Sequence, residues 1–354
     1  MVFRACLFWK KTVLYWYRVL DGKEGICLVK GIILGLYNNF SCAAGSCTST
    51  CCSGWRIEVG NEAFLRFVNI SNQILREDIL SNIYEADGKR YFATKSNGRC
   101  RMLDNDGLCR IQKNLGEGML CNTCRKFPRL ISNHNGLLWI SMAASCPVTA
   151  DYIINSNIEF YMVNNNGNIS VIDIQDIPFI SAGILEHKKI MEKYMSAIRR
   201  PQDYIFMYKS FMDMADNILE VIIESHEIQY LDGCFDYFQE EKNAEEIVSQ
   251  FMEFENIVKT KYRNILENYI IYRTFSRYIE MPEEMDISRL KQVFGELAFI
   301  YIVEFSRYYT LGKCNEKEEF VDSYDWRMVI NWVYRLCAHG LYTRDKIHNI
   351  FMSL

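Results

Sequence analysis

This 354-residue sequence lacks several features that would assign a function at once. It has no excess of positive charge, because 40 Lys and Arg residues face 44 Asp and Glu residues and give a net charge of −4. Binding to a nucleic-acid backbone depends on clustered basic side chains, so we expect no nucleic-acid partner. No uncharged apolar run reaches the roughly 18 residues of a membrane span. The nearest run, residues 26–37, is short and carries Lys30, so we expect no membrane contact.

The first residues do not form a secretory signal. Lys10 and Lys11 interrupt the apolar region that such a signal requires. Without a signal there is no support for an oxidising destination, where disulfides form. We therefore expect a cytoplasmic protein whose cysteines bind metal or stay reduced. Histidine is also scarce, and of the five only His134 lies near the cysteine-rich region as a candidate ligand.

Proline is scarce too, and its positions divide the chain. Four of the five prolines lie before residue 202, which makes the first half rich in loops. Strand-like segments occur at 55–59 and 137–142. Residues 158–163 and 169–174 read as a β-hairpin, because the Asn166-Gly167 step between them suits a turn with positive φ.

The second half follows a helical period instead. The expected helices cover residues 183–199, 203–225, 244–278 with a break near Tyr262, 286–309, 323–339 and 343–352. Apolar residues recur there at spacings of three and four, and Gly340 stands where a glycine would end the helix over 323–339. The sequence thus predicts an α+β protein. A cysteine-rich module of loops and short strands, residues 37–180, precedes a mainly α-helical domain, residues 181–354.

Cysteine is the residue in excess. Nine of the fourteen cysteines lie in about a third of the length: Cys42, Cys47, Cys51, Cys52, Cys100, Cys109, Cys121, Cys124 and Cys146. Thiolates brought together at short loop spacings form sites for soft metals. Structural zinc usually shows paired Cys-x2-Cys, and only Cys121 and Cys124 form such a pair, so the spacing favours an iron-sulfur cluster over zinc. Disulfides or unligated thiols are the third alternative.

The remaining cysteines and one adjacent pair need separate interpretations. Cys51 and Cys52 are neighbours, and side chains of neighbours in extended chain point apart, so we do not expect both to bind one cluster. Five isolated cysteines are interpreted as small buried hydrophobic residues: Cys6, Cys27, Cys234, Cys314 and Cys337.

Several motifs occur in order between residues 37 and 150. They are YNNFSCAAGSCTSTCCSGW at 37–55, CRMLDNDGLC at 100–109, Leu115-Gly116, CRKFPR at 124–129 and SCP at 145–147. Together they resemble the flagellin lysine N-methylase family, whose cysteine domain is described as zinc- or iron-chelating. Residues 1–36 precede the part that matches and form an unmatched N-terminal extension.

The resemblance implies a protein-lysine N-methyltransferase. The methyl group would pass from S-adenosylmethionine to lysine side chains of flagellin, and members of the family are thought to carry an iron-sulfur cluster. The resemblance also implies the metal ligands, of which four would bind one cluster: Cys42, Cys47, Cys51, Cys52, Cys100, Cys109, Cys124 and Cys146. Cys121 counts as an extra cysteine.

The methyl-donor site itself is not visible in the sequence. There is no glycine-rich βα turn followed by an acidic residue, and no Cys-x3-Cys-x2-Cys motif of radical enzymes. Arg125 and Arg129 could grip a carboxylate or offset the charge of a cluster, or could simply flank a turn. Trp55 could face a sulfonium through cation-π contact or lie in the core. Catalytic and donor-binding residues therefore stay unassigned.

A different class of function is open as well. The cysteine module could be a non-catalytic metal-chelating or redox unit, with zinc or iron-sulfur, and the helices an interaction scaffold. Four acidic residues, Glu240, Glu241, Glu245 and Glu246, form either a solvated helix face or a docking surface for a lysine-bearing partner.

Overall fold

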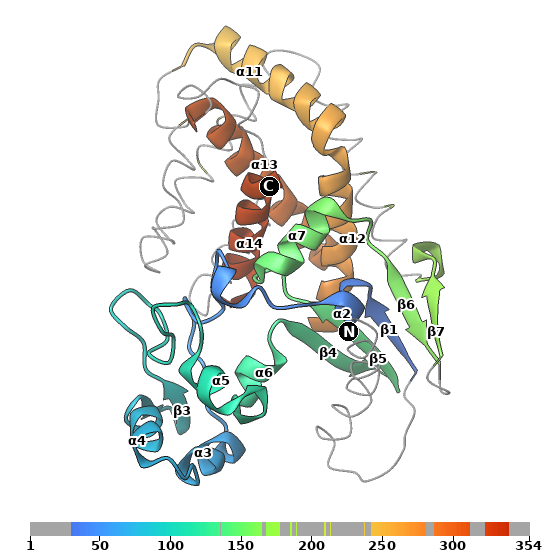
Figure 1. The fold of residues 1–354 in the computed structure, drawn as a ribbon. Helices are drawn as coiled ribbons and strands as arrows, with labels where there is room; N and C mark the ends of the chain where they lie inside the picture. The colour runs from blue at the N-terminus through green and yellow to red at the C-terminus, as the bar shows by residue number, and fades with distance from the viewer. Residues whose placement is uncertain are drawn as a thin grey trace.

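A computed structural model describes residues 30–134, 136–164, 168–177, 242–280, 287–311 and 323–339, with single positions between 185 and 237. Figure 1 shows three parts: a bundle of long helices, a β-sheet beside its lower end, and a small lobe that carries the cysteine-rich loops. The predicted α+β class is confirmed. Among the described residues, no helix combines the length and apolar character needed to cross a membrane.

The sheet has five strands in the order β4-β5-β1-β6-β7. These are β1 (Gly31–Leu34), β4 (Arg129–His134), β5 (Leu137–Met142), β6 (Phe160–Val163) and β7 (Ile169–Ile172). The predicted strand over 137–142 and the predicted hairpin, β6 with β7, are confirmed. The turn residues 165–167 lie outside the described residues.

Strand β1 occupies the middle of this sheet, although its residues fall in the segment interpreted as an extension. It runs parallel to β5 and antiparallel to β6, and all four of its residues are buried. Gly31 fits because a Cβ there would lie 2.8 Å from the carbonyl oxygen of Leu138. Only glycine leaves room for this close approach of two backbones.

The strand predicted over 55–59 is wrong. Ile57 and Val59 are buried and extended, and each bonds the hairpin strand β3 (Lys89–Phe92) once, through Phe92 N to Ile57 O at 3.0 Å and Val59 N to Arg90 O at 2.7 Å. Helix α3 (Asn61–Val68) begins at once. The chain therefore leaves β3 before a ladder of strand pairs can form.

The observed helices of the bundle lie close to the residues predicted from the helical period of the sequence. Its helices are α11 (Ala244–Ile257), α12 (Arg263–Glu280), α13 (Ile287–Leu311) and α14 (Ser323–His339). The break predicted near Tyr262 is a π-helical turn, η5 (Val258–Tyr262), which joins α11 to α12. The helices predicted over 183–199, 203–225 and 343–352, and Gly340, fall outside the residues that the structure describes as elements.

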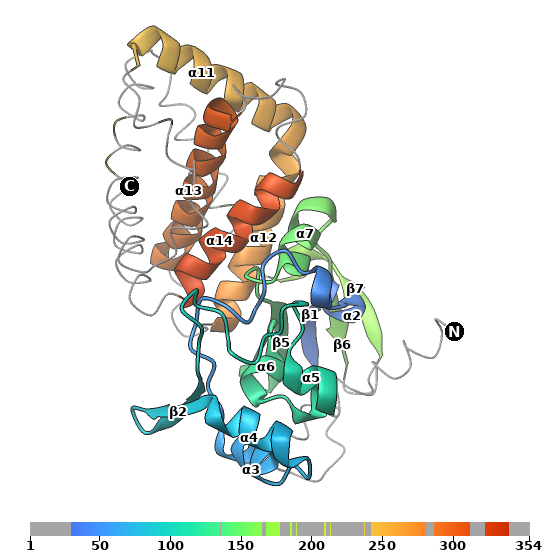
Figure 2. The same ribbon diagram turned by 60° about the vertical axis from the view of Figure 1, so that its left-hand side comes forward.

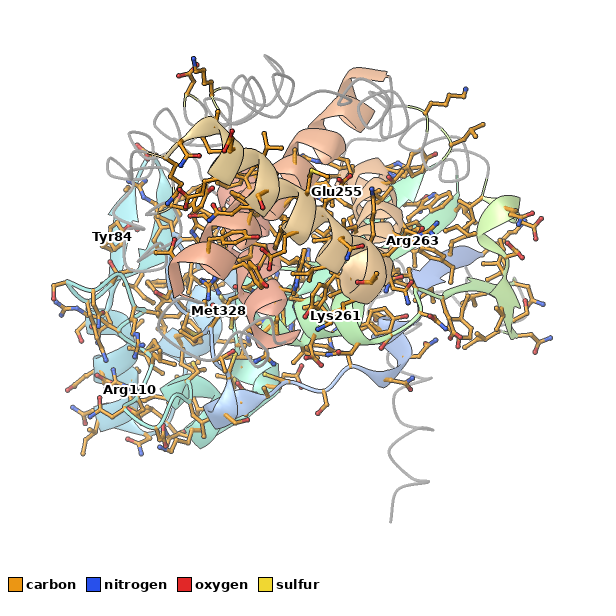
Figure 3. All side chains as sticks on the ribbon, turned by 90° about the horizontal axis from the view of Figure 1, so that it is seen from above. Tyr84, Arg110, Glu255, Lys261, Arg263 and Met328 are labelled. Carbon is orange, nitrogen blue, oxygen red and sulfur yellow. The ribbon has the colours of Figure 1, made fainter. Side chains whose placement is uncertain are left out.

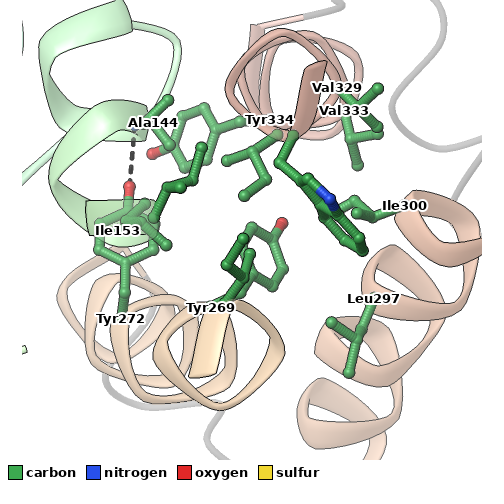
Figure 4. Packing of buried hydrophobic residues seen from close by; sticks show 14 of the residues in the cluster. Ala144, Ile153, Tyr269, Tyr272, Leu297, Ile300, Val329, Val333 and Tyr334 are labelled. Atoms are coloured by element: carbon green, nitrogen blue, oxygen red, sulfur yellow. Dashed lines mark hydrogen bonds between the residues drawn. The ribbon is translucent and has the colours of Figure 1, made fainter. Parts of the chain in front are cut away.

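The bundle and the sheet share one hydrophobic core, here called the main core. Helix α7 (Pro147–Asn155) packs against both α12 and α14 and connects the two parts (Figures 1 and 4). Within this core, the Glu296 carboxylate bonds the guanidinium groups of Arg273 at 2.6 Å and Arg277 at 2.8 Å. Buried charges are stable only when they are paired in this way.

The small lobe has a second core of its own. Its elements are α3, α4 (Gln73–Ser81), β2 (Ile83–Ala86), β3, α5 (Arg110–Leu115) and α6 (Asn122–Lys126). Phe67, Ile79 and Phe92 are buried at its centre. Figure 2 shows the lobe projecting from the bundle, and Figure 3 shows Tyr84 and Arg110 on the side away from Arg263. The lobe and the bundle therefore meet along a narrow junction.

Candidate functional site

The nine clustered cysteines separate into two groups by the core against which they pack. All ten described cysteines are unpaired thiols. Five of the clustered nine belong to the second core of the small lobe and are called the enclosed set: Cys52, Cys100, Cys109, Cys121 and Cys124. The other four lie between the lobe and the bundle and are called the junction set: Cys42, Cys47, Cys51 and Cys146.

Backbone turns bring the enclosed set together. The amide of Cys100 donates to the carbonyl of Cys52 at 2.7 Å, although the two residues are far apart in sequence. Cys109 and Cys121 are the residues that precede α5 and α6. Gly107, with φ of 76°, makes the turn ahead of Cys109, a conformation that other residues rarely adopt. Cys121, set aside in the sequence as an extra, lies inside this set.

Helix α14 holds the junction set from the bundle side. The Asn331 amide donates to the carbonyl of Ala144 at 2.9 Å and accepts from the Ser49 hydroxyl at 3.2 Å. The same helix contributes Arg335, which bonds the loop just before Cys51 and the residue just before Cys146. In addition, the Tyr272 hydroxyl on α12 accepts from the Ala144 amide at 2.8 Å (Figure 4). The bundle thus positions two separate cysteine loops against each other.

Within the enclosed set, a thiol-thiol hydrogen bond lowers the pKa of one cysteine and raises that of its partner. The Cys124 thiol donates to the Cys121 sulfur, which lowers the pKa of Cys121 to about 7 and raises that of Cys124. The Arg66 guanidinium also favours the Cys121 thiolate. Burial raises the pKa of Cys100 to about 12. A proton shared in this way makes one sulfur of the pair a ready ligand for a cation.

The two sets meet at one turn. The Cys51 thiol donates to the Cys52 sulfur, so that the pKa of Cys51 is raised and that of Cys52 is lowered. Beyond this contact, Cys51 interacts electrostatically with Cys42 and Cys146, whereas Cys52 interacts with Cys121 in the enclosed set and with Cys47 in the junction set. The expectation that Cys51 and Cys52 do not both bind one cluster stays a prediction, and their sulfurs are in contact.

A cavity opens at the junction. It is small and partly open to solvent, and its lining residues are Cys51, Ser53, Gly54, Trp55, Phe127, Ser145 and Arg335. The Trp55 indole donates to the carbonyl of Cys51 at 2.7 Å, and its ring lies 6.1 Å from that of Phe127. One wall is therefore aromatic and another carries a thiol.

Arg335 contributes the charge in this cavity. It is 8% exposed, and its Nη2 donates to the carbonyls of Ser49 at 3.3 Å, Thr50 at 3.1 Å and Ser145 at 3.3 Å. Its Nε has no hydrogen-bond partner, and no carboxylate in the described part of the chain forms an ion pair with it. Among the described residues this buried guanidinium is held by neutral carbonyls, so no described carboxylate offsets its positive charge.

The donor chemistry of both sets is uniform, since every member is a thiol. In the described ranges, no three His, Cys, Asp or Glu side chains are placed so that they could hold a single metal ion. A polynuclear cluster binds each thiolate at a different iron atom and so spreads its ligands more widely than one ion does. The donor type is that of a site for a soft metal.

The other residues suggested by the sequence lie as follows. His134 ends strand β4, where its ring packs on Tyr278 at 5.7 Å and not among the thiols. Arg129 lies over the rings of Tyr37, at 5.9 Å, and Phe40, at 5.5 Å.

The remaining candidates from the sequence are placed as follows. Arg125 donates to the Asn122 side chain at 2.7 Å and interacts electrostatically with Cys121. Glu245 and Glu246 lie in the first turn of α11, while Glu240 and Glu241 fall outside the described residues. Cys337 is buried in the main core, as predicted, whereas Cys6, Cys27, Cys234 and Cys314 lie outside the described residues.

Sequence reasoning missed Asn331 and Arg335. Both lie on the face of α14 that also carries Trp332, and an amide and a guanidinium on an apolar face are the available signal. Such polar groups are generally buried only where they can form hydrogen bonds. The partners, loops 49–50 and 144–145, come from distant parts of the chain, so no local pattern identifies them.

No family model and no solved structure matches the chain. Flagellar biosynthetic protein FliU of Salmonella muenchen is 30% identical over 122 residues, which cover 33% of this chain and 72% of FliU. Proteins named Lysine-N-methylase from Salmonella choleraesuis and Salmonella typhimurium are 29% identical over 122 and 121 residues. The chain belongs to the flagellin lysine N-methylase family. The resemblance seen in the motifs is thereby confirmed, and the matched part spans 30% of the length of either methylase.

Proposed function

We propose that this protein transfers methyl groups from S-adenosylmethionine to lysine side chains of flagellin and carries a cysteine-ligated iron-sulfur centre. The observation that carries the proposal is the cavity at the junction, where Arg335, two aromatic rings and the Cys51 thiol face one space. The similarity to proteins named Lysine-N-methylase and to a flagellar biosynthetic protein supports the reaction and the substrate.

The cavity offers a partner to each charged end of a methionine-type donor. The carboxylate of the donor would bond Arg335, whose charge no described carboxylate neutralises. Guanidinium groups recognise carboxylates with two parallel hydrogen bonds. The rings of Trp55 and Phe127 would face the sulfonium, because the negative face of an aromatic ring attracts a cation.

The acceptor lysine must lose its proton before it can attack. Its reference pKa is about 10.4, so it is charged near neutral pH. Removal from water lowers this pKa, and so does a nearby positive charge. A buried Arg335 and a bound sulfonium supply both conditions. The Nζ lone pair then forms the new N–C bond while the S–C electrons return to sulfur, and the proton released from nitrogen passes to water.

The thiols suit a reduced compartment, and we place the reaction in the cytoplasm. All ten described cysteines are unpaired, and thiols persist where glutathione and thioredoxin keep them reduced. When bound, an iron-sulfur centre would tie the cysteine loops together and supply an electron carrier beside the cavity.

The test is transfer of labelled methyl from S-adenosylmethionine to unmethylated flagellin by anaerobically purified protein. We expect label on lysine. Arg335→Lys keeps the charge but loses the planar fork, so it should raise the KM for the donor by roughly 10-fold or more while kcat changes less. Arg327→Lys, on the same helix and paired with Asp151, is the matched control and should behave as the parent protein.

Absence of label from a folded, metal-containing protein would contradict the proposal. If such a protein still bound flagellin but showed no affinity for S-adenosylmethionine, the non-catalytic interaction protein would be the better description.

A further inference from the structure

We propose that the nine clustered cysteines form two separate metal centres, one in the enclosed set and one in the junction set. This inference rests on the cysteine-ligated metal of the proposed function. It differs from a single site with surplus cysteines, in which four sulfurs bind and the other five serve packing.

Packing is the first reason. The enclosed set lies within the second core, among Phe67, Phe92 and Met102. Cys146 instead belongs to the main core, and Cys42, which is exposed, belongs to neither. A single centre that used sulfurs of both sets would have to draw ligands from two cores that are otherwise separate.

The two sets are also held by different structural elements. The enclosed set depends on turns inside the lobe, such as the bond from Cys100 to Cys52. The junction set depends on α14, whose Asn331 and Arg335 fix the loops that carry Cys51 and Cys146. Each scaffold would remain in place if the other opened.

The number of ligands is sufficient for both. A cubane cluster takes four thiolates. The junction set supplies four and the enclosed set five. The adjacent residues Cys51 and Cys52 are divided between the sets, which allows one turn to serve both centres.

Each set has its own cation. Arg335 acts on Cys47 in the junction set, and Arg66 acts on Cys121 in the enclosed set. A centre with four thiolates carries net negative charge, and a neighbouring guanidinium offsets it. Each set therefore has at least one guanidinium beside it, and Arg125 lies near Cys121 as a second one in the enclosed set.

The centres differ in access to solvent. Cys42 is exposed and the junction cavity is open, whereas Cys100 and Cys121 are 3% and 1% exposed. The enclosed centre would therefore be the less accessible of the two, since none of its five cysteines is fully exposed. The junction centre would be the reactive one, since it adjoins the cavity with Arg335.

The experiment measures metal per chain in full-length protein reconstituted anaerobically with iron and sulfide or with zinc. Removing two junction ligands, Cys42→Ser with Cys146→Ser, should lower bound metal to about half if the centres are alike. Removing two enclosed ligands, Cys109→Ser with Cys124→Ser, should have a similar effect. The four changes together should abolish binding, and Cys337→Ala, outside both sets, should change nothing.

A single shared centre predicts a different result, because either double variant alone would then lose all the metal. That outcome would overturn the inference while the proposed metal centre survived. No metal in the unmodified protein under any reconstitution would instead overturn the proposed metal centre itself. Cys42→Ser alone removes an exposed thiol and little packing, so complete loss of metal in this variant would also decide against two centres.

Discussion

The main core and the second core are built in opposite ways. The main core joins a sheet to long helices and includes charged groups that pair with one another, such as Glu296 with Arg273. The second core is small, its elements are short, and five of the residues in or against it are cysteines. A core of that size buries little apolar surface, and small domains commonly need a metal or disulfides to be stable. The main core therefore has enough apolar contact to hold itself together, and under the proposed metal centres the second core would gain much of its stability from the bound metal.

Removal of metal should give the largest contrast between the two cores. Because metal binding to such a site is largely folding free energy, amides near Cys100 and Cys121 should lose nearly all protection from hydrogen exchange. Amides of α12 and α13 should keep theirs. Hydrogen exchange with mass spectrometry before and after anaerobic chelation measures both. Equal loss in the two regions would show that the cores unfold as one unit.

Glu296→Gln should have the next largest effect, which is a loss of stability in the main core. It leaves the buried guanidinium groups of Arg273 and Arg277 without a full counter-charge, which should lower the free energy of unfolding by about 3–5 kcal/mol. Denaturant unfolding of the loaded protein measures this. The exposed pair Arg263–Glu267 gives the control, since Glu267→Gln should cost less than about 1 kcal/mol. If the variant lost metal while the free energy of unfolding of the bundle stayed unchanged, the prediction would be contradicted.

The same glutamate sets an acid dependence. Burial alone would raise the pKa of Glu296, but Arg273 and Arg277 outweigh it and lower the pKa to about 2. The folded state therefore gains stability above the ordinary glutamate pKa and loses it as pH falls from there toward 2. Unfolding curves of the parent protein should weaken over this window, and those of Glu296→Gln should lack that part of the weakening.

Asn331→Ala should loosen the junction between the cores by a smaller amount. It removes two hydrogen bonds and leaves the buried carbonyl of Ala144 unpaired, which should cost about 1–3 kcal/mol. If the junction set is a separate centre, metal should leave it first while the enclosed set stays loaded. Metal release under a chelator, followed over time, should change from one slow phase to a fast and a slow phase. Asn114→Ala, which removes one exposed side-chain bond, serves as the control.

The smallest expected effect comes from a matched pair of helix caps. Asn72 accepts from the Leu75 amide at 3.1 Å at the start of α4, and Asn243 accepts from the Glu246 amide at 2.8 Å at the start of α11. Replacement by Ala should cost about 1 kcal/mol in each case. Asn72→Ala should raise exchange only in the second core, and Asn243→Ala only in the bundle. Spreading of either effect to the other core would show that they are coupled.

The elements that the sequence predicted well are those with a local signal. Helix α14 carries apolar residues at helical spacing and is found at the predicted residues, and hairpin β6–β7 shows alternation around a turn. Strand β1 has no such signal, because four apolar residues acquire their role only from β5 and β6, which lie about 100 residues later in the chain.

The candidate site divides in the same way. The nine cysteines could be identified from the sequence alone, because their residue type and the intervals between them can be read directly from it. Their separation into two sets could not, since it depends on which core each loop packs against. Arg335 was missed for a related reason: the carbonyls of Thr50 and Ser145 that hold it belong to loops far away in sequence.

The central position of β1 also bears on the order in which the protein is made. Gly31–Leu34 leaves the ribosome before any of its partners, and β5 follows only after the whole run of cysteine loops. At a synthesis rate of roughly 5–20 residues per second, the strand waits about 5–20 s for its neighbours. The nascent thiol loops are exposed during that interval, and the sheet closes only afterwards. Under the proposed metal centres, translation would thus leave time for the loops to bind metal before the sheet closes.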